Sequence, residues 1–418
     1  MRSHKEGLEQ PFSLALRVRK ISALGALVST GAILPTPALS AKNSPLKNVA
    51  AVEIQTKEIG VVSDLAEQLD PSRSEQAVSL IQWAGFNALK ETVQIATGQQ
   101  GFRAMNENDQ TKINNSLDAA QEAGLPVTLY LWSQSWIKHY QPPVTPNQQR
   151  GFCKVGAQII AAHPGVVEAA AIGQEFNNPK FYKRQFNEDG SDAAAKSAEK
   201  LTAICYDTIK AVDPTVKIIG IEASASGNDD PNSKRPSHAP ITFIKDFCQA
   251  YRDSGRPSPI LDEVSVHYYR VAHQTSQTIN GVTDYAKIQK ALNCFESTGQ
   301  PIPALQFGEG GDTTLESGKL IKRYGGKAPG GSLAVSETAQ GQDFANDIEQ
   351  VVCHQPNTTS IFNFQLIDDG SILDSGFGRA PLKLQRSGAG ADITFQPKDG
   401  FSTIENAIIA YNSGTLCE

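Results

Sequence analysis

Hydrophobic and polar positions alternate between two patterns from about residue 59 to residue 411 of the chain. Short apolar runs bounded by turn-forming residues predict buried strands, and longer stretches with apolar residues three or four positions apart predict amphipathic helices. The expected strands are 59–62, 87–94, 126–131, 166–172, 216–222, 260–269, 302–309 and 360–367. The expected helices are 74–84, 108–123, 146–162, 192–212, 240–254, 284–297, 337–354 and 400–411.

Each expected strand is followed by an expected helix. Right-handed crossovers through helices place successive strands side by side in one parallel sheet. Eight strand–helix pairs are the number that closes a (β/α)8 TIM barrel, so the expected fold class is α/β with this architecture. An open, doubly wound sheet is the alternative, although no glycine-rich phosphate loop follows any strand.

The N-terminus has the pattern of a targeting segment. Arg17, Arg19 and Lys20 precede the apolar run Ile21–Leu34, and small residues follow up to Ala41. A charged flank, a short apolar run and a small-residue exit are typical of a secretory signal peptide, and an uncleaved anchor is the alternative. The expected organisation is a signal peptide over 1–41, a linker over 42–58 and one catalytic barrel domain over 59–418.

The six cysteines all lie in the exported part of the chain. An even number of cysteines in an oxidising compartment predicts disulfides, and no pair has the CxxC spacing typical of metal sites. Bridges between successive helical layers are the favoured pairing. The expected disulfides are Cys153–Cys205, Cys248–Cys294 and Cys353–Cys417.

Composition limits the classes of partner. The chain has 38 Lys and Arg against 44 Asp and Glu, a formal net charge of −6, with 39% hydrophobic and 20% charged residues. These fractions are those of a soluble globular protein with a sizeable core. Because no block of basic residues occurs, nucleic acid is not an expected partner.

Two expected strands end in a glutamate. Glu175 follows the run 166–172 and precedes a turn-forming Asn-Asn-Pro, whereas Glu309 ends the run 302–309 and precedes two glycines. The carboxyl ends of barrel strands form the mouth where the chemistry occurs, and glycines let a ligand approach the backbone. We therefore expect Glu175 and Glu309 to meet at the mouth of the barrel.

Two carboxyl groups are the usual machinery for hydrolysing a glycosidic bond. One carboxylic acid protonates the leaving oxygen, and the other carboxylate attacks the sugar or directs water. Their environments must separate the two pKa values, and a retaining pair lies about 5–5.5 Å apart. We interpret Glu175 as the acid/base and Glu309 as the nucleophile. Salt-bridged carboxylates at a barrel rim are the alternative.

Several segments resemble clan A, a superfamily of barrel glycoside hydrolases that includes cellulase-like and xylosidase-like enzymes. Residues 84–90, AGFNALK, are similar to the family's lead into strand two, and 264–269, VSVHYY, to its strand-six His/Tyr segment. Residues 365–369 and 397–401 are similar to its strand-eight ending and the lead into its last helix. The resemblance spans roughly residues 59–411 and leaves the subfamily open. It implies an acid/base at Glu175 and a nucleophile at Glu309.

Three positions depart from the family's pattern. Gln174 stands where the family usually has the Asn that binds the sugar 2-hydroxyl. Lys90 stands where an Arg commonly supports the nucleophile, and lysine lacks the bidentate fork of arginine. Phe364 and Gln365 occupy the region of the family's strand-eight Trp.

Other polar and aromatic residues near the strand ends are candidate contacts. His267 either contacts substrate or is a hydrogen-bonded structural histidine, and Tyr269 either holds Glu309 or packs. Trp132 is interpreted as a platform for a sugar ring, with core packing as the alternative, whereas Trp83 is interpreted as core. The expected substrate-binding residues are Gln174, Lys90, Trp132, Asn177, His267, Tyr269 and Gln365, and the secondary candidates are Glu222, Trp136 and Asp368.

These observations predict an exported retaining glycosidase, secreted or periplasmic, that cleaves β-linked oligo- or polysaccharides. It is expected to need no metal or organic cofactor and to have no stable membrane insertion once the signal is cleaved. A non-catalytic carbohydrate-binding barrel is the main alternative, because of the three departures. A metal-dependent barrel hydrolase is disfavoured, because the seven histidines include no HxH or HxxxH pair at a strand end.

Overall fold

The structure is a computed structural model that describes residues 57–63, 70–133, 135, 138–270, 274–314, 334–368, 380–387 and 392–418. The expected signal peptide and all but the last two residues of the expected linker lie outside these ranges. The barrel belongs to a compact unit that comprises Lys57–Gln385 and Phe395–Glu418.

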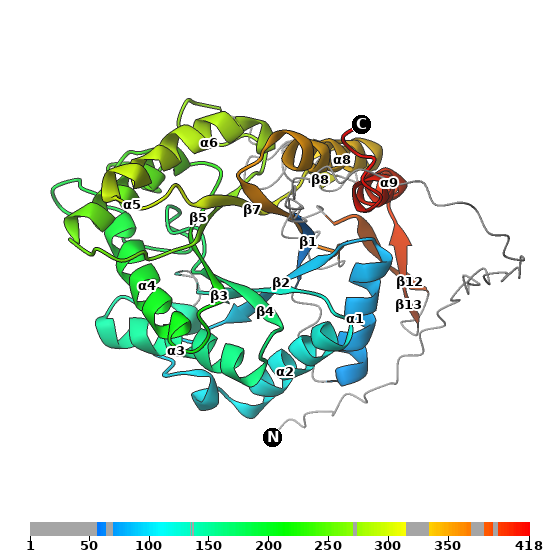
Figure 1. Ribbon diagram of the computed structural model, residues 1–418, viewed down its shortest axis with the longest axis horizontal. Coiled ribbons are helices and arrows are strands. Elements are labelled where there is room, and N and C mark those ends of the chain that lie inside the picture. Colours follow the sequence, from blue (N-terminus) through cyan, green and yellow to red (C-terminus); the bar gives the residue numbers. More distant parts are fainter. Residues whose placement is uncertain are drawn as a thin grey trace, which may run out of the picture. The chain divides into compact units, whose positions relative to one another are not determined.

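Eight parallel strands close into a ring (Figure 1). Following the chain, β1 to β7 lie next to one another, and β10 pairs with both β7 and β1. The expected (β/α)8 barrel is therefore confirmed, and the open sheet is wrong because the two edge strands pair with a common neighbour. The strands are β1 (Glu58–Ser63), β2 (Ala88–Gln94), β3 (Val127–Trp132), β4 (Val167–Ile172), β5 (Lys217–Ala223), β6 (Glu263–His267), β7 (Ala304–Gly310) and β10 (Thr358–Phe364).

Helices surround the ring of strands (Figure 1). Their first turns carry the expected start signals: Asp70, Asn106 and Asp192 each accept a hydrogen bond from a backbone N–H of the helix they cap. Thr145 and Gln148 form a capping box. The helices are α1 (Pro71–Trp83), α2 (Glu107–Glu122), α3 (Pro146–Ala162), α4 (Ala193–Lys210), α5 (Pro240–Asp253), α6 (Tyr285–Leu292), α8 (Glu337–His354) and α9 (Phe401–Asn412), and a 3-10 turn, η4 (Asn293–Thr298), extends α6.

Alternate residues of each strand belong to two separate apolar clusters. In β4, Ala169 and Ala171 belong to a small cluster with Tyr130 and Phe362, whereas Ala170 and Ile172 belong to the large one that contains the helices' apolar side chains. Because successive side chains of a strand point to opposite faces, the small cluster fills the ring and the large one joins the ring to its helices. This rigid double layer fixes where each strand ends.

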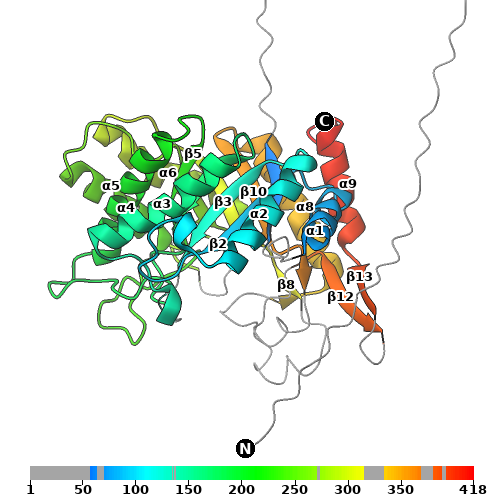
Figure 2. The same cartoon turned by 90° about the horizontal axis from the view of Figure 1, so that it is seen from below.

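Short strands beyond the barrel were not expected from the sequence. β8 (Thr313–Thr314) pairs with β9 (Ala334–Val335), and β11 (Ile367–Asp368), β12 (Leu382–Ser387) and β13 (Asp392–Pro397) form a three-stranded sheet. β8 begins three residues after β7 ends, and Figure 2 shows it below the labelled barrel strands. The expected strand over 360–367 is thus two strands, because β10 ends at Phe364.

Three disulfides join the helical layer: Cys153–Cys205 between α3 and α4, Cys248–Cys294 between α5 and η4, and Cys353–Cys417 between α8 and the segment after α9. These are the pairs expected from the sequence. Disulfides fit an oxidising compartment. Among the described residues, no helix combines the length and apolar character needed to cross a membrane. Export itself stays a prediction.

The Cys353–Cys417 disulfide should stabilise the closing helix. We expect the double variant Cys353→Ala/Cys417→Ala to lose about 2–4 kcal/mol of unfolding free energy, because the bridge restricts the unfolded chain over a separation of 64 residues. Chemical denaturation, with the wild type measured beside it under non-reducing conditions, checks the value. An unchanged midpoint in the variant would contradict the stabilising role.

Candidate active site

Four side chains meet where β4, β5, β6 and β7 end. Glu175 lies three residues beyond β4, and Glu222, His267 and Glu309 lie in the last residues of β5, β6 and β7. The strand register shifts beside two of them, between Gly220 and Ala223 and between Val266 and His267. Such irregularities re-aim side chains at barrel rims. Glu222 is only a secondary candidate from the sequence, although it ends its strand much as Glu309 does.

Two of the glutamates have a backbone conformation that is costly for residues with a side chain. The φ angle is 36° at Glu175 and 40° at Glu222, with 75° at the neighbouring Ile221. Left-handed conformations of such residues cost on the order of 1–3 kcal/mol each and persist where the surrounding structure enforces them. The barrel therefore holds both carboxylates in the site against a local preference.

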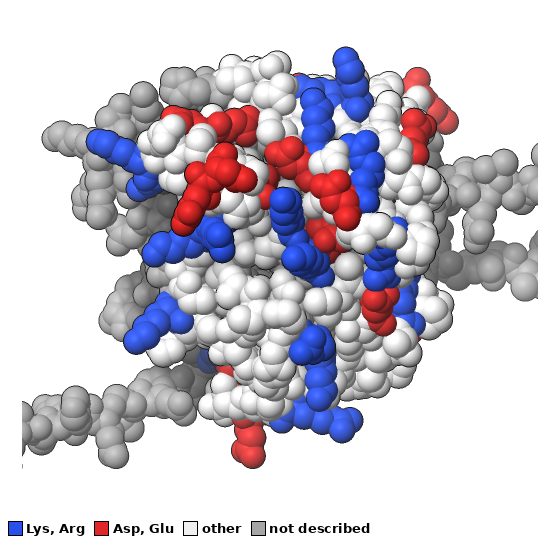
Figure 3. Space-filling model, turned by 90° about the vertical axis from the view of Figure 1, so that its left-hand side faces the viewer, with Lys and Arg blue, Asp and Glu red and all other residues white. Residues whose placement is uncertain are grey.

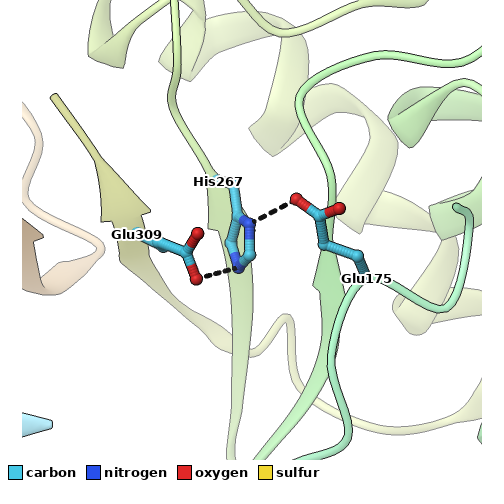
Figure 4. A group of neighbouring side chains, drawn as sticks. All are labelled: Glu175, His267 and Glu309. Atoms are coloured by element: carbon cyan, nitrogen blue, oxygen red, sulfur yellow. Dashed lines mark hydrogen bonds and ion pairs between the residues drawn. The ribbon is translucent and has the colours of Figure 1, made fainter. Parts of the chain in front are cut away.

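His267 lies among three carboxylates. Its Nδ1 is 2.9 Å from Oε1 of Glu175, and its Nε2 is 3.2 Å from Oε2 of Glu222. The same Nε2 is 3.7 Å from Oε2 of Glu309, so the ring stands between Glu175 and Glu309 (Figure 4). The imidazole is fully buried. Of the two expected interpretations, the structure gives His267 the internal hydrogen bonds rather than an open face toward substrate.

Lys90 supports this cluster from inside the barrel. Its Nζ donates to Oε1 of Glu222 at 2.9 Å and to the carbonyl oxygen of Gly308 at 3.1 Å, and it lies 4.2 Å from the centre of the Tyr130 ring. Lys90 is fully buried because it lies in the middle of β2 rather than at its end. This burial disfavours the expected direct contact between Lys90 and substrate, and the positive charge of Lys90 serves Glu222.

The two expected catalytic glutamates approach each other closely. One carboxylate oxygen of Glu175 and one of Glu309 lie within 4.8 Å. The Tyr269 hydroxyl donates to Oε1 of Glu309 at 2.5 Å, and Asn178 Nδ2 donates to Oε2 of Glu175 at 2.7 Å. Asn178 is not among the residues expected from the sequence. Its position in the turn three residues after Glu175 is the sequence feature that could have pointed to this contact.

The charge of His267 follows from this geometry. Burial lowers the pKa of the ring, but the negative charge of Glu309 and the hydrogen bonds to Glu175 and Glu222 outweigh burial and raise the pKa to about 10. The ring is therefore an imidazolium at neutral pH. A cation here lets three carboxylates share one buried space.

The pKa values of the glutamates separate under the same influences. Burial raises the pKa of Glu175, but the hydrogen bond and the charge of His267 lower it by more, so the net shift is downward. The pKa of Glu222 is also lowered, since Lys90 and His267 together outweigh its burial. Burial and the nearby Glu175 raise the pKa of Glu309 despite the opposing charge of His267. Glu309 therefore binds a proton most readily in the protein alone.

One atom each from Glu175, His267 and Glu309 also lies close enough to share a metal ion. A histidine ligand must be neutral, because the metal takes the lone pair of a ring nitrogen. His267 is held as an imidazolium that donates both N–H groups. Its present hydrogen bonds therefore suit proton and charge chemistry better than metal coordination.

The remaining candidates are spread around the mouth. Gln174 is nearly buried beside Glu175, and its Oε1 has no hydrogen-bond partner among the described residues. Trp132 is half-buried at the end of β3, 6.3 Å from the ring of Phe181. Gln365 is half-buried directly after β10, and its Oε1 likewise has no partner in the described part. Trp136 and the side chain of Asp368 lie outside the described residues.

Burial and exposure bear on two further expectations. Asn177 is fully buried, its Nδ2 donates to the carbonyl oxygens of Ser224 and His238, and its Oδ1 accepts from Ser224 N. It fastens the segment after β5, so both polar atoms of the Asn177 side chain are engaged within the protein, which disfavours the expected contact with substrate. Trp83 is 53% exposed and stacks on Phe401 with ring centres 5.2 Å apart, so its expected place in the core is wrong.

Solved structures of glycoside hydrolases share this fold. A family 39 glycoside hydrolase from Bacteroides cellulosilyticus WH2 superposes with a TM-score of 0.56 at 14% identity, over 85% of this chain and 64% of that one. The exo-β-1,4-mannosidase from Opitutaceae bacterium strain TAV5 gives 0.54 at 11% identity, over 86% and 60%. A monomeric β-xylosidase from Caulobacter crescentus CB15 gives 0.51 at 14% identity, over 84% and 67%.

This chain thus spans less than two thirds of the first two of these proteins. At such low identities, the likeness establishes the barrel fold that the resemblance to clan A implied. No known protein family and no curated protein matches the sequence. The activity must therefore be argued from the site.

The Lys90–Glu222 pair should be strongly coupled. We expect Lys90→Met to lower the free energy of unfolding by about 3–5 kcal/mol, because it leaves a buried carboxylate without its lysine. The double variant Lys90→Met/Glu222→Gln should lose less than the sum of the two single variants. Chemical denaturation of all three measures the coupling.

The matched control is Lys210→Met, which removes a partly exposed ion pair with Asp262 and should cost less than about 1 kcal/mol. Additive losses at Lys90 and Glu222 would mean that the two side chains do not stabilise each other.

His267 should stay protonated well above neutral pH. Its folded pKa is raised, so its contribution to stability is complete below the unfolded pKa near 6.5 and is lost as pH rises towards about 10. Nitrogen NMR of the ring should show the imidazolium at about pH 8, and Glu222→Gln should lower its titration midpoint. A ring that is already neutral at pH 7 would contradict this electrostatic account.

Proposed function

We propose that this protein is a retaining glycoside hydrolase of β-linked sugars in which Glu175 and Glu309 are the catalytic pair. The observation that carries the proposal is their separation: an oxygen of each lies within 4.8 Å at the mouth of the barrel. An inverting pair lies about 6.5–9.5 Å apart, because a water molecule must fit between one carboxylate and the sugar. Oxygens within 4.8 Å are in keeping with the about 5–5.5 Å between the carboxyl groups of a retaining pair, which favours direct attack by a carboxylate.

The reaction would have two steps. Glu309 attacks the anomeric carbon while Glu175 gives its proton to the leaving oxygen, which forms a glycosyl ester on Glu309. Water then attacks the same carbon and gives a proton to Glu175, and the bond to Glu309 breaks. Both carboxyl groups return to their starting protonation, and the sugar keeps its anomeric configuration.

The assigned roles need a proton on Glu175 and a negative charge on Glu309. In the protein alone the pKa of Glu175 is lowered and that of Glu309 is raised, which favours the reverse arrangement. Hydrogen bonds from a substrate favour the change. A glycosidic oxygen only accepts hydrogen bonds, so it favours the protonated form of Glu175, whereas sugar hydroxyls can donate and favour ionised Glu309. Substrate binding would thus exchange the order of the two pKa values.

His267, Glu222 and Lys90 would position this pair without touching the sugar. The imidazolium hydrogen-bonds Glu175 and lies beside Glu309, so its charge stabilises whichever of the two is ionised. Glu222 fixes the ring through Nε2, and Lys90 fixes Glu222. Tyr269 orients Glu309 by donating to its Oε1.

The half-buried and orphaned groups around the pair are the proposed substrate contacts. The Oε1 atoms of Gln174 and Gln365 are buried without a partner in the described part of the chain, and a rotation of either side chain would let its Oε1 accept from a sugar hydroxyl. The exposed part of Trp132 can stack on a ring. The names of the structural neighbours, a β-1,4-mannosidase and a β-xylosidase among them, are in keeping with a β-linked substrate. Export follows from the expected signal peptide and fits the three disulfides.

A non-catalytic carbohydrate-binding barrel is the second candidate. Its support is that both oxygens of Glu175 are already engaged, Oε1 by His267 and Oε2 by Asn178. Such a carboxylate is held ionised and would make a poor acid. Glycan binding without turnover, across a broad panel of β-linked sugars, would identify this function.

Activity of carboxylate variants tests the catalytic pair. We expect Glu309→Gln to lower kcat by at least about 10³-fold on every substrate, because the attacking carboxylate is lost. Glu175→Gln should lose about 10²–10⁴-fold on substrates with a poor leaving group but much less on an aryl glycoside whose phenolate leaves without a proton. The exposed Glu349→Gln on α8 is the control and should keep full activity.

Azide separates the two roles. Added azide should rescue Glu175→Gln with release of a glycosyl azide of retained configuration, since azide attacks the intermediate on Glu309 without base assistance. The opposite result would be that Glu309→Gln shows the dependence on leaving group and releases the glycosyl azide of retained configuration. That result would exchange the roles assigned to Glu175 and Glu309. Full activity of both variants would refute the pair.

A further inference from the structure

A second cluster of titratable side chains lies away from the active site. Asp192 caps α4, His238 lies two residues before α5, and Asp246 lies within α5. One ligand atom of each lies within 4.8 Å of the others. The proposed reaction uses none of these residues.

His238 is fixed at the centre of this cluster. It is 2% exposed, its ring packs 4.0 Å from that of Phe186, and its Nε2 lies 3.0 Å from the carbonyl oxygen of Gln185 and 3.3 Å from Oδ1 of Asp192. A third carboxylate, Asp229, lies 4.0 Å from Nδ1. Oxygen atoms of side chains and backbone therefore surround a single buried imidazole.

Negative charge in this cluster exceeds the positive charge available to it. No lysine or arginine in the described ranges forms an ion pair with Asp192, Asp229 or Asp246. The side chain of Asp192 is 7% exposed, and its Oδ2 is buried with no N–H donor in the described part of the chain, although the carboxyl group of Asp246 lies within hydrogen-bond reach of the Asp192 carboxyl group. Two carboxylates this close cannot both be ionised unless a proton or a cation lies between them.

Asp192 and Asp246 also form a side-chain hydrogen bond with each other, so a proton lies between the two carboxyl groups in the protein alone. A cation bound by both carboxyl groups would take the place of that proton.

We propose that Asp192, His238 and Asp246 bind a divalent transition-metal ion, with Zn²⁺ or Mn²⁺ as the class. An imidazole with two carboxylates is a donor set that suits these ions, and protein carbonyls or water can complete the coordination. The Oδ2 of Asp192, which no N–H in the described part of the chain reaches, and the excess of negative charge are what such an ion would satisfy. A neutral His238 would donate its ring nitrogen to the metal.

The ion would join three segments of the mouth. Asp192 ends the loop after β4, His238 ends the loop after β5, and Asp246 belongs to the helix that follows. The backbone N–H of His238 donates to the carbonyl oxygen of Asn177, two residues from Glu175. Lys183–Gly190 of the first loop and Pro231, Asn232 and Pro236 of the second line an open hollow of about 730 Å³. The metal would thus stabilise the loops that form this hollow.

The surface around the cluster does not by itself select a cation. Figure 3 shows the flank of the barrel toward α4 and α5, where basic and acidic side chains are interspersed. A broad field of one sign would attract ions without a defined site. Selectivity must therefore come from the buried donor set.

Metal titration of the full-length, untagged protein tests the proposal. After treatment with a chelator, calorimetry with Zn²⁺ and with Mn²⁺ should give one equivalent bound for at least one of them, and that ion should raise the thermal midpoint of unfolding. Asp246→Asn should weaken binding by at least about tenfold, because one of three protein ligands becomes an amide. Asp253→Asn, on the same helix, is the matched control and should bind as the wild type does.

Glu309→Gln distinguishes this site from the cluster at the active site. It should bind the ion with unchanged affinity, whereas its loss of binding would place the metal on Glu175, His267 and Glu309 and overturn the proposal. Absence of binding by both ions, or equal binding by Asp246→Asn, would overturn it as well. Circular dichroism of metal-free Asp246→Asn separates loss of a ligand from loss of fold, and Asp192→Asn replaces it if it does not fold.

Discussion

A buried positive charge on His267 is the interaction on which the mouth of this barrel depends. Glu175, Glu222 and Glu309 come from three strands or the turns after them, and mutual repulsion would otherwise oppose their approach. The imidazolium offsets that repulsion and, through two fixed N–H groups, sets the direction of two of the carboxylates. Lys90 acts in the same way deeper in the barrel, where its ammonium group forms an ion pair with Glu222.

The barrel supports this close approach of carboxylates because its strands end at fixed places. Alternating side chains of each strand fill the ring on one face and pack against helices on the other, so a strand cannot slide without exposing its apolar residues. The strained backbone at Glu175 and Glu222 is tolerated on that support. The rigid scaffold thereby fixes the separation between the carboxyl groups of Glu175 and Glu309.

Sequence patterns predicted the architecture well because strand and helix periodicities are local. They also pointed to Glu175, Glu309, His267 and Tyr269, since each lies close to the end of an apolar run. The sequence left Glu222 a secondary candidate and grouped Lys90 and Asn177 with the substrate contacts, because burial and hydrogen-bond partners depend on residues far away in the chain. Trp83 shows the same limit: its helix position resembled core, but its ring lies on the outside against Phe401. The strands β8, β9 and β11 were missed, since two-residue strands carry no periodicity, and the six-residue strands β12 and β13 were missed as well.

The disulfides reinforce only part of the helical layer around the barrel. Bridges fasten α3 to α4, α5 to η4 and α8 to the last residues, but the chain has no cysteine before Cys153, so α1 and α2 have only noncovalent contacts. Local opening is easiest where packing alone opposes it. Transient exposure of backbone amides, and the first sites of cleavage by proteases in the surrounding medium, should therefore fall in the sector of α1 and α2, on the side of the ring next to the lysine-bearing strand β2.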